Sequence, residues 1–288
     1  MPEPTPPAPL RVRGLELRFG TRTYIMGIVN VTPDSFSGDG LLAAASPMDA
    51  AVAQAERMVA EGADIIDVGG ESTRPGHDPV SAVDERRRVA AIVRGIRAQL
   101  PDVPISIDTR KPAVAVAALE AGADMLNDVG GVTAVAALAT VAAAHGAPYI
   151  VMHSRAQPVY HDVVSEVIAD LERALGQAEA AGCAGHMLIA DPGIGFGKTA
   201  EQNLILLAGL ADLRVLGRPI LLGTSRKSTI GRVLDLPVEE RLEGTLATTA
   251  LGIAAGVDIV RVHDVAANVR VARMSDAIIR GHWRERAS

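Results

Sequence analysis

The chain has 288 residues, of which 48% are hydrophobic and 2% are aromatic, and its formal net charge is −6 at pH 7. This length and apolar content allow one large domain with a sizeable core. The low aromatic content argues against a platform that stacks nucleic-acid bases, and the negative charge gives no reason to expect a polyanionic partner such as nucleic acid. The single cysteine, Cys183, excludes an intramolecular disulfide.

The N-terminal residues 1–9, MPEPTPPAP, are rich in proline and lack the basic and apolar regions of a signal peptide. No apolar run approaches the roughly 18 residues that a membrane-spanning helix needs. We therefore expect a soluble, cytoplasmic protein with no membrane segment. A disordered tail is expected over residues 1–9, followed by a single domain over residues 10–288.

Residues 10–18 alternate apolar and polar side chains, and the turn that follows predicts a short β-hairpin. Eight apolar runs then predict strands at 24–31, 64–68, 103–107, up to 126, 148–152, 187–190, 219–222 and 258–262. Helices are expected between them at 46–62, 80–100, 112–122, 135–145, 162–181, after 201 and at 238–255, with a last helix closing the chain. Because each strand is followed by a helix, the pattern favours a (β/α)8 TIM barrel, with the N-terminal hairpin plugging its bottom.

Polar side chains follow these strands, at the ends where such barrels build their sites. Asp108 and Asp191 each end an apolar strand, where a carboxylate needs a ligand or a cation to offset its desolvation. Together with Asn127 they fit a recess for a flat heterocycle rich in N–H donors. The alternative is that either Asp caps the helix that follows it.

A cationic set follows the last two strands, where barrels commonly bind phosphate. Its members are Ser225, Arg226, Lys227, Arg261 and His263. The alternative is ordinary surface charge, but these residues interrupt buried strands, which favours phosphate binding. Thr73 and Arg74 would add to this set. Asn30, at the end of the first strand, is a neutral oxygen ligand that suits Mg²⁺ shared with phosphate oxygens.

Three other features of the sequence are interpreted without a catalytic or binding role. Residues 193–199, GIGFGKT, look like a nucleotide-binding phosphate loop, but Pro192 stands where that motif requires glycine. We interpret them as a turn whose glycines adopt positive φ, with direct phosphate cradling as the alternative. The histidines outside the strand ends have no metal-ligand spacing, so no zinc site is predicted. Cys183 is expected to serve packing or to lie at the surface.

Seven segments resemble, in order and at barrel pitch, the signatures of the dihydropteroate synthase family. They are GIVNVTPDSFSGDG (27–40), GGESTRPG (69–76), SIDTRK (106–111), NDVGG (127–131), DPGIGFGK (191–198), GTSRKS (223–228) and RVHDV (261–265). The resemblance covers essentially residues 24–280. It implies a (β/α)8 barrel, usually a homodimer, which condenses (7,8-dihydropterin-6-yl)methyl diphosphate with 4-aminobenzoate with the help of Mg²⁺.

The resemblance also implies residue roles. The pterin would be held by Asp108, Asn127, Asp191 and Lys227, of which the two aspartates and the lysine would be catalytic. The diphosphate would be bound by Thr73, Arg261 and His263, and Asn30 would be the Mg²⁺ ligand. The aminobenzoate pocket would be lined by Phe36, Pro75 and Ser225. Residues 32–40 and the loop around Arg74 would close over the site, which leads to the hypothesis that pterin diphosphate binds before aminobenzoate.

Two alternatives belong to other functional classes. A pterin-dependent methyltransferase domain uses a related barrel but needs no leaving-group site, so the cationic set argues against it. A catalytically silent paralogue that only binds pterin is the second alternative.

Overall fold

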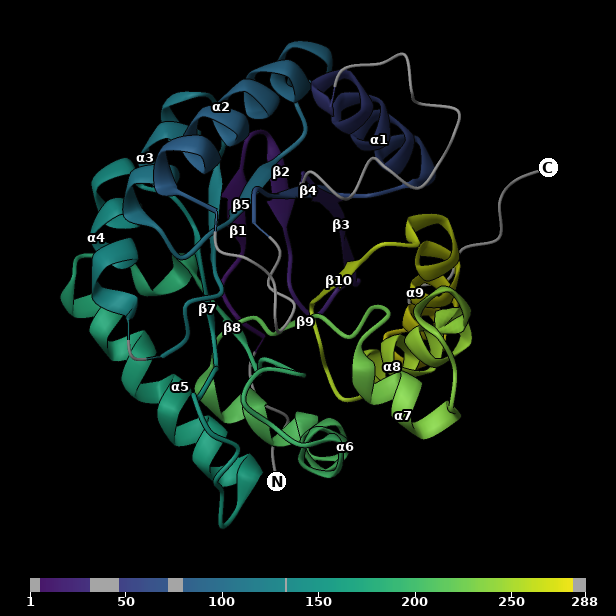
Figure 1. Ribbon diagram of the computed structural model, residues 1–288. Helices are drawn as coiled ribbons and strands as arrows, with labels where there is room; N and C mark the ends of the chain where they lie inside the picture. Colours follow the sequence, from purple (N-terminus) through teal and green to yellow (C-terminus); the bar gives the residue numbers. More distant parts are fainter. Residues whose placement is uncertain (1–5, 32–46, 72–79, 133, 282–288) are drawn as a thin grey trace.

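The computed structural model describes residues 6–31, 47–71, 80–132 and 134–281. The helices form a ring around a central parallel sheet (Figure 1). In the described part of the chain this sheet has eight strands with the spatial order β8-β7-β6-β5-β4-β3-β10-β9. Their bounds are β3 Tyr24–Asn30, β4 Ile65–Gly69, β5 Ile105–Asp108, β6 Met125–Asp128, β7 Tyr149–Met152, β8 Leu188–Asp191, β9 Leu221–Leu222 and β10 Ile259–Val262.

The sheet closes between β8 and β9. A single parallel bridge joins Ala190 to Ile220, and the Ala190 N–H donates to the Pro219 carbonyl at 2.9 Å. The strand predicted over residues 219–222 is therefore regular only at Leu221–Leu222. The predicted (β/α)8 barrel is confirmed, because the eight strands of this sheet are parallel, helices lie between them and the two sheet edges meet.

The helices agree with the predicted positions except after β9. The described α-helices are α1 Pro47–Glu61, α2 Ala82–Gln99, α3 Pro112–Glu120, α4 Val135–His145, α5 Val163–Ala180, α6 Ala200–Ala208, α7 Ser228–Leu234, α8 Leu242–Ala254 and α9 Val265–Ile279. The expected helix over 238–255 begins only at Leu242, and the unpredicted α7 precedes it. Asp235, at φ 54°, ends α7, and Pro237 then keeps the chain extended. None of the described helices is long and apolar enough to cross a membrane.

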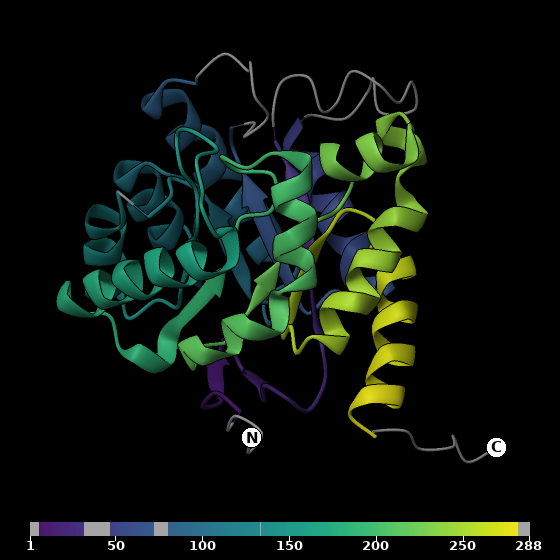
Figure 2. The same cartoon turned by 90° about the horizontal axis from the view of Figure 1, so that it is seen from below.

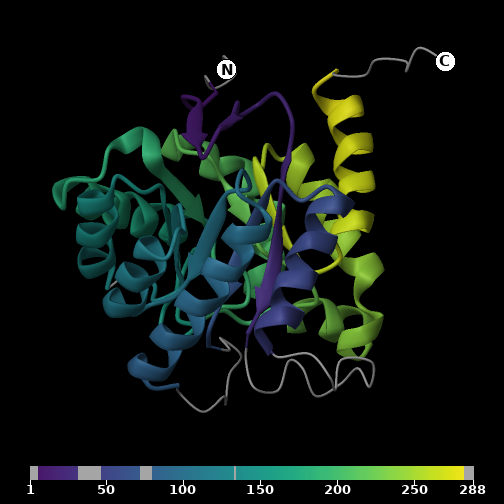
Figure 3. The ribbon, with the colours of Figure 1, turned by 90° about the horizontal axis from the view of Figure 1, so that it is seen from above.

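The predicted hairpin is present and closes one end of the barrel (Figures 2 and 3). Its strands, β1 Leu10–Val12 and β2 Leu15–Leu17, pair antiparallel. Leu10, Val12 and Leu17 are buried in one cluster with side chains from the first half of the barrel strands, among them Met26 and Ile65. Burying side chains of this kind contributes about 1.5–3 kcal/mol each, so the hairpin is an integral part of the core. The division into a tail over 1–9 and one domain over 10–288 stays a prediction, and residues 1–5 and 282–288 lie outside the described part.

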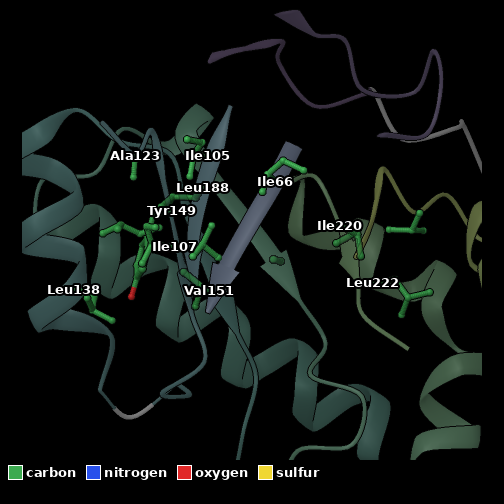
Figure 4. Close-up of a cluster of buried hydrophobic side chains, with 14 of the residues drawn as sticks. Ile66, Ile105, Ile107, Ala123, Leu138, Tyr149, Val151, Leu188, Ile220 and Leu222 are labelled. Atoms are coloured by element: carbon green, nitrogen blue, oxygen red, sulfur yellow. The ribbon is translucent and has the colours of Figure 1, made fainter. Parts of the chain in front are cut away.

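Strand residues alternate between the two faces of the barrel wall. Ile66, Ile107 and Val151 point outward into the larger core between the sheet and the helices, to which Leu138 of α4 also belongs (Figure 4). Their neighbours in the strands point inward because successive side chains of a strand alternate. Near the carboxyl ends these inward positions carry polar groups.

Candidate functional site

A layer of polar side chains fills the barrel interior near the carboxyl ends of the strands. Pairing in register aligns Asn30 with Gly69, Gly69 with Asp108, and Asp108 with Asn127. The inward-facing polar residues are Asn30 of β3, Asp67 of β4, Ser106 and Asp108 of β5, Asn127 of β6, Asp191 of β8 and Arg261 of β10. The structure thus brings Asp108, Asn127 and Arg261, which are far apart in the chain, into one site.

Arg261 joins two carboxylates across the barrel interior. Its Nε lies 2.6 Å from Asp67 Oδ2, and its Nη2 lies 2.6 Å from Asp108 Oδ2. The Asn127 amide donates from Nδ2 to the same Oδ2 of Asp67 at 3.1 Å. Because β10 is not a neighbour of β4 or β5 in the sheet, these contacts must cross the inside of the barrel.

Burial sets the electrostatics of this group. Burial raises the pKa of Asp108 to about 7, and the negative charge of Asp67 acts in the same direction, while Arg261 opposes both. For Arg261 itself, burial lowers the pKa, but the attraction of Asp67 and Asp108 outweighs it and the pKa is raised. Near neutral pH the site therefore holds a permanent cation and a carboxyl group that can take up or release a proton.

Asp191 and Lys227 form the opposite side of the site. Burial raises the pKa of Asp191, and Lys227 opposes this shift, while Asp191 Oδ1 accepts the Gly193 N–H at 2.7 Å. Burial lowers the pKa of Lys227 to about 8, and the charge of Asp191 limits the fall. Lys227 donates to the Ile194 carbonyl. Its Nζ also lies 4.5 Å from the centre of the Phe196 ring, a cation–π distance.

Neither aspartate caps a helix. The N-cap of α3 is Lys111, which makes no side-chain cap, and α6 is capped by Thr199 in a capping box with Gln202. The capping alternative for Asp108 and Asp191 is therefore wrong. Both carboxylates remain for other contacts at the carboxyl ends of their strands.

The loop after β8 confirms the interpretation of its glycines. Gly193, Gly195 and Gly197 all have positive φ. A Cβ on Gly193 would stand 1.8 Å from the His153 carbonyl oxygen, so no other residue fits there. The loop is a tight strand-to-helix turn, as predicted. Its geometry positions the Ile194 carbonyl and the Phe196 ring, which hold Lys227.

A buried network under this loop was not predicted. Lys198 Nζ donates to the carbonyls of Gly193 and Phe196 at 3.0 and 3.1 Å and lies 2.9 Å from His153 Nδ1. His153 is fully buried, and its Nε2 lies 3.2 Å from Asp170 Oδ2. Burial lowers the pKa of His153 to about 4, so its ring is neutral at pH 7. The network holds the turn in place through the Gly193 and Phe196 carbonyls. Sequence spacing gave no signal for His153 or Lys198.

On the rim, Ser225 and His263 lie in direct contact. The Ser225 hydroxyl oxygen lies 2.9 Å from His263 Nδ1 and accepts the backbone N–H of His263 at 3.1 Å. Arg226 behaves differently from the expected phosphate ligand. It adopts φ 57° and forms two hydrogen bonds to the Asp264 carboxylate, at 3.0 and 2.5 Å. Arg226 therefore forms a local ion pair with Asp264 instead of pointing into the site as a phosphate ligand would.

Asn30 is half-buried at the end of β3. A Cβ on Gly69 would stand 3.7 Å from both Asn30 Oδ1 and Asp108 Oδ2, so Gly69 lies between these two side chains. The described residues contain no cluster of three or more His, Cys, Asp or Glu that could hold a metal ion. A single neutral oxygen fits Mg²⁺, which keeps most of its waters, and does not fit zinc.

Four other predicted site residues lie outside the described part of the chain, as does the loop over 32–40. They are Phe36, Thr73, Arg74 and Pro75. Conversely, Asp67 was not predicted, although it is fully buried at the centre of the site. The signal was present in the sequence, because Asp67 lies two positions from both Ile65 and Gly69 in an apolar strand and so faces inward.

The chain is similar to known pterin-binding enzymes both in sequence and in fold. The profile of a family described as pterin binding enzymes matches residues 26–263. A dihydropteroate synthase from Clostridium beijerinckii is 48% identical over 94% of this chain and 100% of its own length. The structure of a dihydropteroate synthase from Clostridium difficile, in the presence of pteroic acid, is 49% identical, covers 91% of this chain and 98% of that chain, and has a TM-score of 0.86. One from Xanthomonas albilineans with 4-aminobenzoic acid is 41% identical, covers 95% and 98%, and has a TM-score of 0.87.

Proposed function

The chain belongs to the dihydropteroate synthase family of pterin-binding enzymes, and from this premise we propose how its residues carry out the reaction. It is a transferase of folate biosynthesis that condenses (7,8-dihydropterin-6-yl)methyl diphosphate with 4-aminobenzoate, giving 7,8-dihydropteroate and diphosphate. The observation that carries the assignment is the set of buried polar groups at the strand ends, Asp108, Asn127 and Asp191, inside a barrel of this family.

The pterin ring would lie among Asp108, Asn127, Asp191 and Lys227. A pterin edge is rich in N–H donors, which the two carboxylates accept, and Lys227 donates to a ring acceptor. Both carboxylates are more than nine-tenths buried, so a ligand that supplies hydrogen bonds to them relieves an unfavourable desolvation. Affinity in this recess therefore depends on charge and hydrogen bonds more than on apolar contact.

The carboxylates on one side of the site and the cations on the other suit departure of diphosphate. Loss of the leaving group makes the pterin methylene carbon electron-poor, and the carboxylates of Asp108 and Asp191 stabilise that positive charge from the ring side. Arg261 and His263 would stabilise the leaving group. The contacts of Arg261 with Asp67 and Asp108 use Nε and Nη2, which leaves Nη1 for the diphosphate.

Attack by the arylamine needs positioning more than a strong base. The amine nitrogen of 4-aminobenzoate forms the new C–N bond and then loses a proton. No described residue is assigned as a dedicated general base. Ser225, held by His263, would lie at the aminobenzoate side together with Phe36 and Pro75, and Thr73 would join the diphosphate site.

Asn30 would be the protein ligand of Mg²⁺, which would neutralise charge on the diphosphate. The test is calorimetric titration of diphosphate into the protein with and without Mg²⁺. In the wild type Mg²⁺ should tighten diphosphate binding, and in Asn30→Ala this gain should largely disappear. A full gain in the variant would exclude Asn30 as the ligand.

We also propose that the protein is a cytoplasmic homodimer. Support for a dimer comes from α8 and α9, which pack together and expose large apolar side chains, including Leu251, Met274 and Ile278 at 69%, 62% and 67%. Light scattering should give a dimer mass for the wild type and a monomer mass for the double variant Leu251→Glu, Ile278→Glu. A dimer in both would place the interface elsewhere.

The decisive test of the reaction uses the purified protein. Incubation with pterin diphosphate, 4-aminobenzoate and Mg²⁺ should give dihydropteroate and diphosphate, detected by mass spectrometry. A silent pterin-binding paralogue would bind the pterin in calorimetry and give no product. A pterin-dependent methyltransferase domain would show no diphosphate release, and it has no use for the contact between Ser225 and His263 beside Lys227.

A further inference from the structure

Asp67 is a fully buried carboxylate whose bonding is uneven. Its Oδ2 accepts two hydrogen bonds, from Arg261 Nε at 2.6 Å and from Asn127 Nδ2 at 3.1 Å. Its Oδ1 is buried and has no hydrogen-bond partner. Burying a carboxylate has an unfavourable desolvation free energy unless both oxygens are hydrogen-bonded. The presence of Asp67 here therefore indicates a role beyond packing.

The first reason is the orientation of the Asn127 amide. A carboxylate paired with Arg261 is an acceptor only, so Asn127 must turn its NH₂ group, and not its oxygen, toward Asp67. The two ends of an amide have nearly the same shape, and hydrogen bonds decide which way it points. Asn127 Oδ1 is then directed away from Asp67, and it is buried without a partner of its own.

The second reason is the position of Arg261. Asp67 holds Nε while Asp108 holds Nη2, so the two carboxylates contact different atoms of the guanidinium. If a ligand N–H competes for Asp108, Asp67 would still hold Nε. Because the guanidinium is planar, one such contact together with the strand backbone still restricts its plane.

We propose that Asp67 is a positioning residue that locks the Asn127 amide so that Oδ1 is presented to the ligand as a hydrogen-bond acceptor. The consequence is selectivity: the recess accepts a heterocycle with an exocyclic amino group and rejects the same heterocycle with an oxo group. An oxo group would place an oxygen against Asn127 Oδ1, leaving two buried acceptors without a donor. This inference rests on the pterin recess proposed above.

The test compares 6-hydroxymethylpterin with 6-hydroxymethyllumazine, which has a 2-oxo group in place of the 2-amino group. Calorimetry on the wild type should show tighter binding of the pterin. In Asp67→Asn the carboxamide at position 67 can accept or donate, so Asn127 can turn over, and the selectivity ratio should fall roughly tenfold or more. A purely structural role would weaken both ligands alike and leave the ratio unchanged.

The matched control is Asp276→Asn. Asp276 is also a buried carboxylate paired with an arginine, Arg280 at 2.9 Å, but it accepts hydrogen bonds from Thr23, just before β3 and at the other end of that strand from the recess. Its variant should lose stability and keep the selectivity ratio. In an Asn127→Ala background, Asp67→Asn should leave the ratio unchanged, because the residue through which it acts has been removed.

A measurement on the wild type keeps the inference testable if Asp67→Asn does not fold. In NMR spectra of the ligand-free protein, the side-chain NH₂ of Asn127, identified by its loss in Asn127→Ala, should exchange slowly with solvent. Fast exchange of this NH₂ group would overturn the role of Asp67. So would a selectivity ratio that is unchanged in Asp67→Asn, or one that still falls when Asn127 has been replaced by alanine.

A wild type that binds neither the pterin nor the lumazine would overturn the proposed recess itself. The experiment therefore distinguishes failure of the role of Asp67 from failure of the recess.

Discussion

Arg261 and Asp108 lie 153 positions apart in the chain, yet the guanidinium Nη2 of one is 2.6 Å from the carboxylate Oδ2 of the other. The contact links β10 to β5 through the barrel interior, where the side chain of Arg261 is 18% exposed and that of Asp108 is 6% exposed. In such surroundings, removing one partner of an ion pair is far more costly than removing a surface pair.

Arg261→Ala should lower the free energy of unfolding by about 3–5 kcal/mol near pH 8, because it leaves Asp67 and Asp108 buried without a cation. A buried carboxylate without a cation has a raised pKa and takes up a proton as the pH falls. The loss should therefore be smaller near pH 5.5 than near pH 8. Urea denaturation at both pH values measures it.

The control for this prediction is Arg11→Ala. Arg11 pairs with Glu16 at 3.0 Å, but its side chain is 83% exposed, so its loss should cost less than about 1 kcal/mol at either pH. If Arg261→Ala were no worse than Arg11→Ala, the pair would not be buried as the structure has it.

Binding of a pterin without diphosphate should depend on pH in a bell shape. Asp108, with a pKa of about 7, accepts ligand N–H groups when ionised, so affinity should fall as the pH drops through this value. Lys227, with a pKa of about 8, donates when charged, so affinity should also fall as the pH rises through that value. Calorimetry with 6-hydroxymethyl-7,8-dihydropterin between about pH 5.5 and 9.5 tests both limbs.

Single variants assign the two limbs. Asp108→Asn should move the acidic limb, because its amide does not titrate and Asp191, whose pKa burial also raises, is the remaining carboxylate acceptor. Lys227→Arg should lose the alkaline limb, because a guanidinium stays charged throughout this range. An acidic limb that does not move in Asp108→Asn, or an alkaline limb that persists in Lys227→Arg, would mean that other groups titrate.

Asp191→Asn should weaken pterin binding by about 100-fold or more, because the neutral amide cannot accept charge-assisted hydrogen bonds at both of its terminal atoms. The fold should survive, since burial already disfavours the charged form of Asp191 and its pKa is raised. Calorimetry and thermal unfolding measure the two effects. Asp212→Asn, at an exposed position, is the control, and pterin binding as tight as wild type in Asp191→Asn would exclude Asp191 from the recess.

Gly193→Ala should destabilise the protein severely, because its Cβ would stand 1.8 Å from the His153 carbonyl and its φ is positive. Gly176→Ala is the matched control: it lies inside α5 with nothing within 4 Å of the added Cβ, so it should stabilise by about 0.5–1 kcal/mol. Thermal unfolding compares the two. Equal melting temperatures would mean that the loop after β8 relaxes to accept the methyl group.

Local pattern in the sequence was sufficient for the barrel. Apolar runs and helix signals depend on residues close together in the chain, and they located every main strand and placed Asp108, Asn127 and Asp191 at strand ends. The same reasoning found that Gly193 serves a turn, because Pro192 breaks the competing motif. It missed α7, a short helix that the left-handed Asp235 ends, and it began the next helix at residue 238 when α8 begins at Leu242.

Only the tertiary structure decided which side chains contact one another across the barrel. The alternation in β4 indicates that Asp67 faces inward, but its contacts with Asn127 and Arg261 exist because closure of the sheet brings β4, β6 and β10 around one interior. The sequence likewise grouped Arg226 with Lys227, whereas their side chains diverge, one to Asp264 and one to the Ile194 carbonyl. Alternation along a strand determines the face on which a side chain lies, while the distance between side chains on different strands depends on how the whole sheet curves and closes.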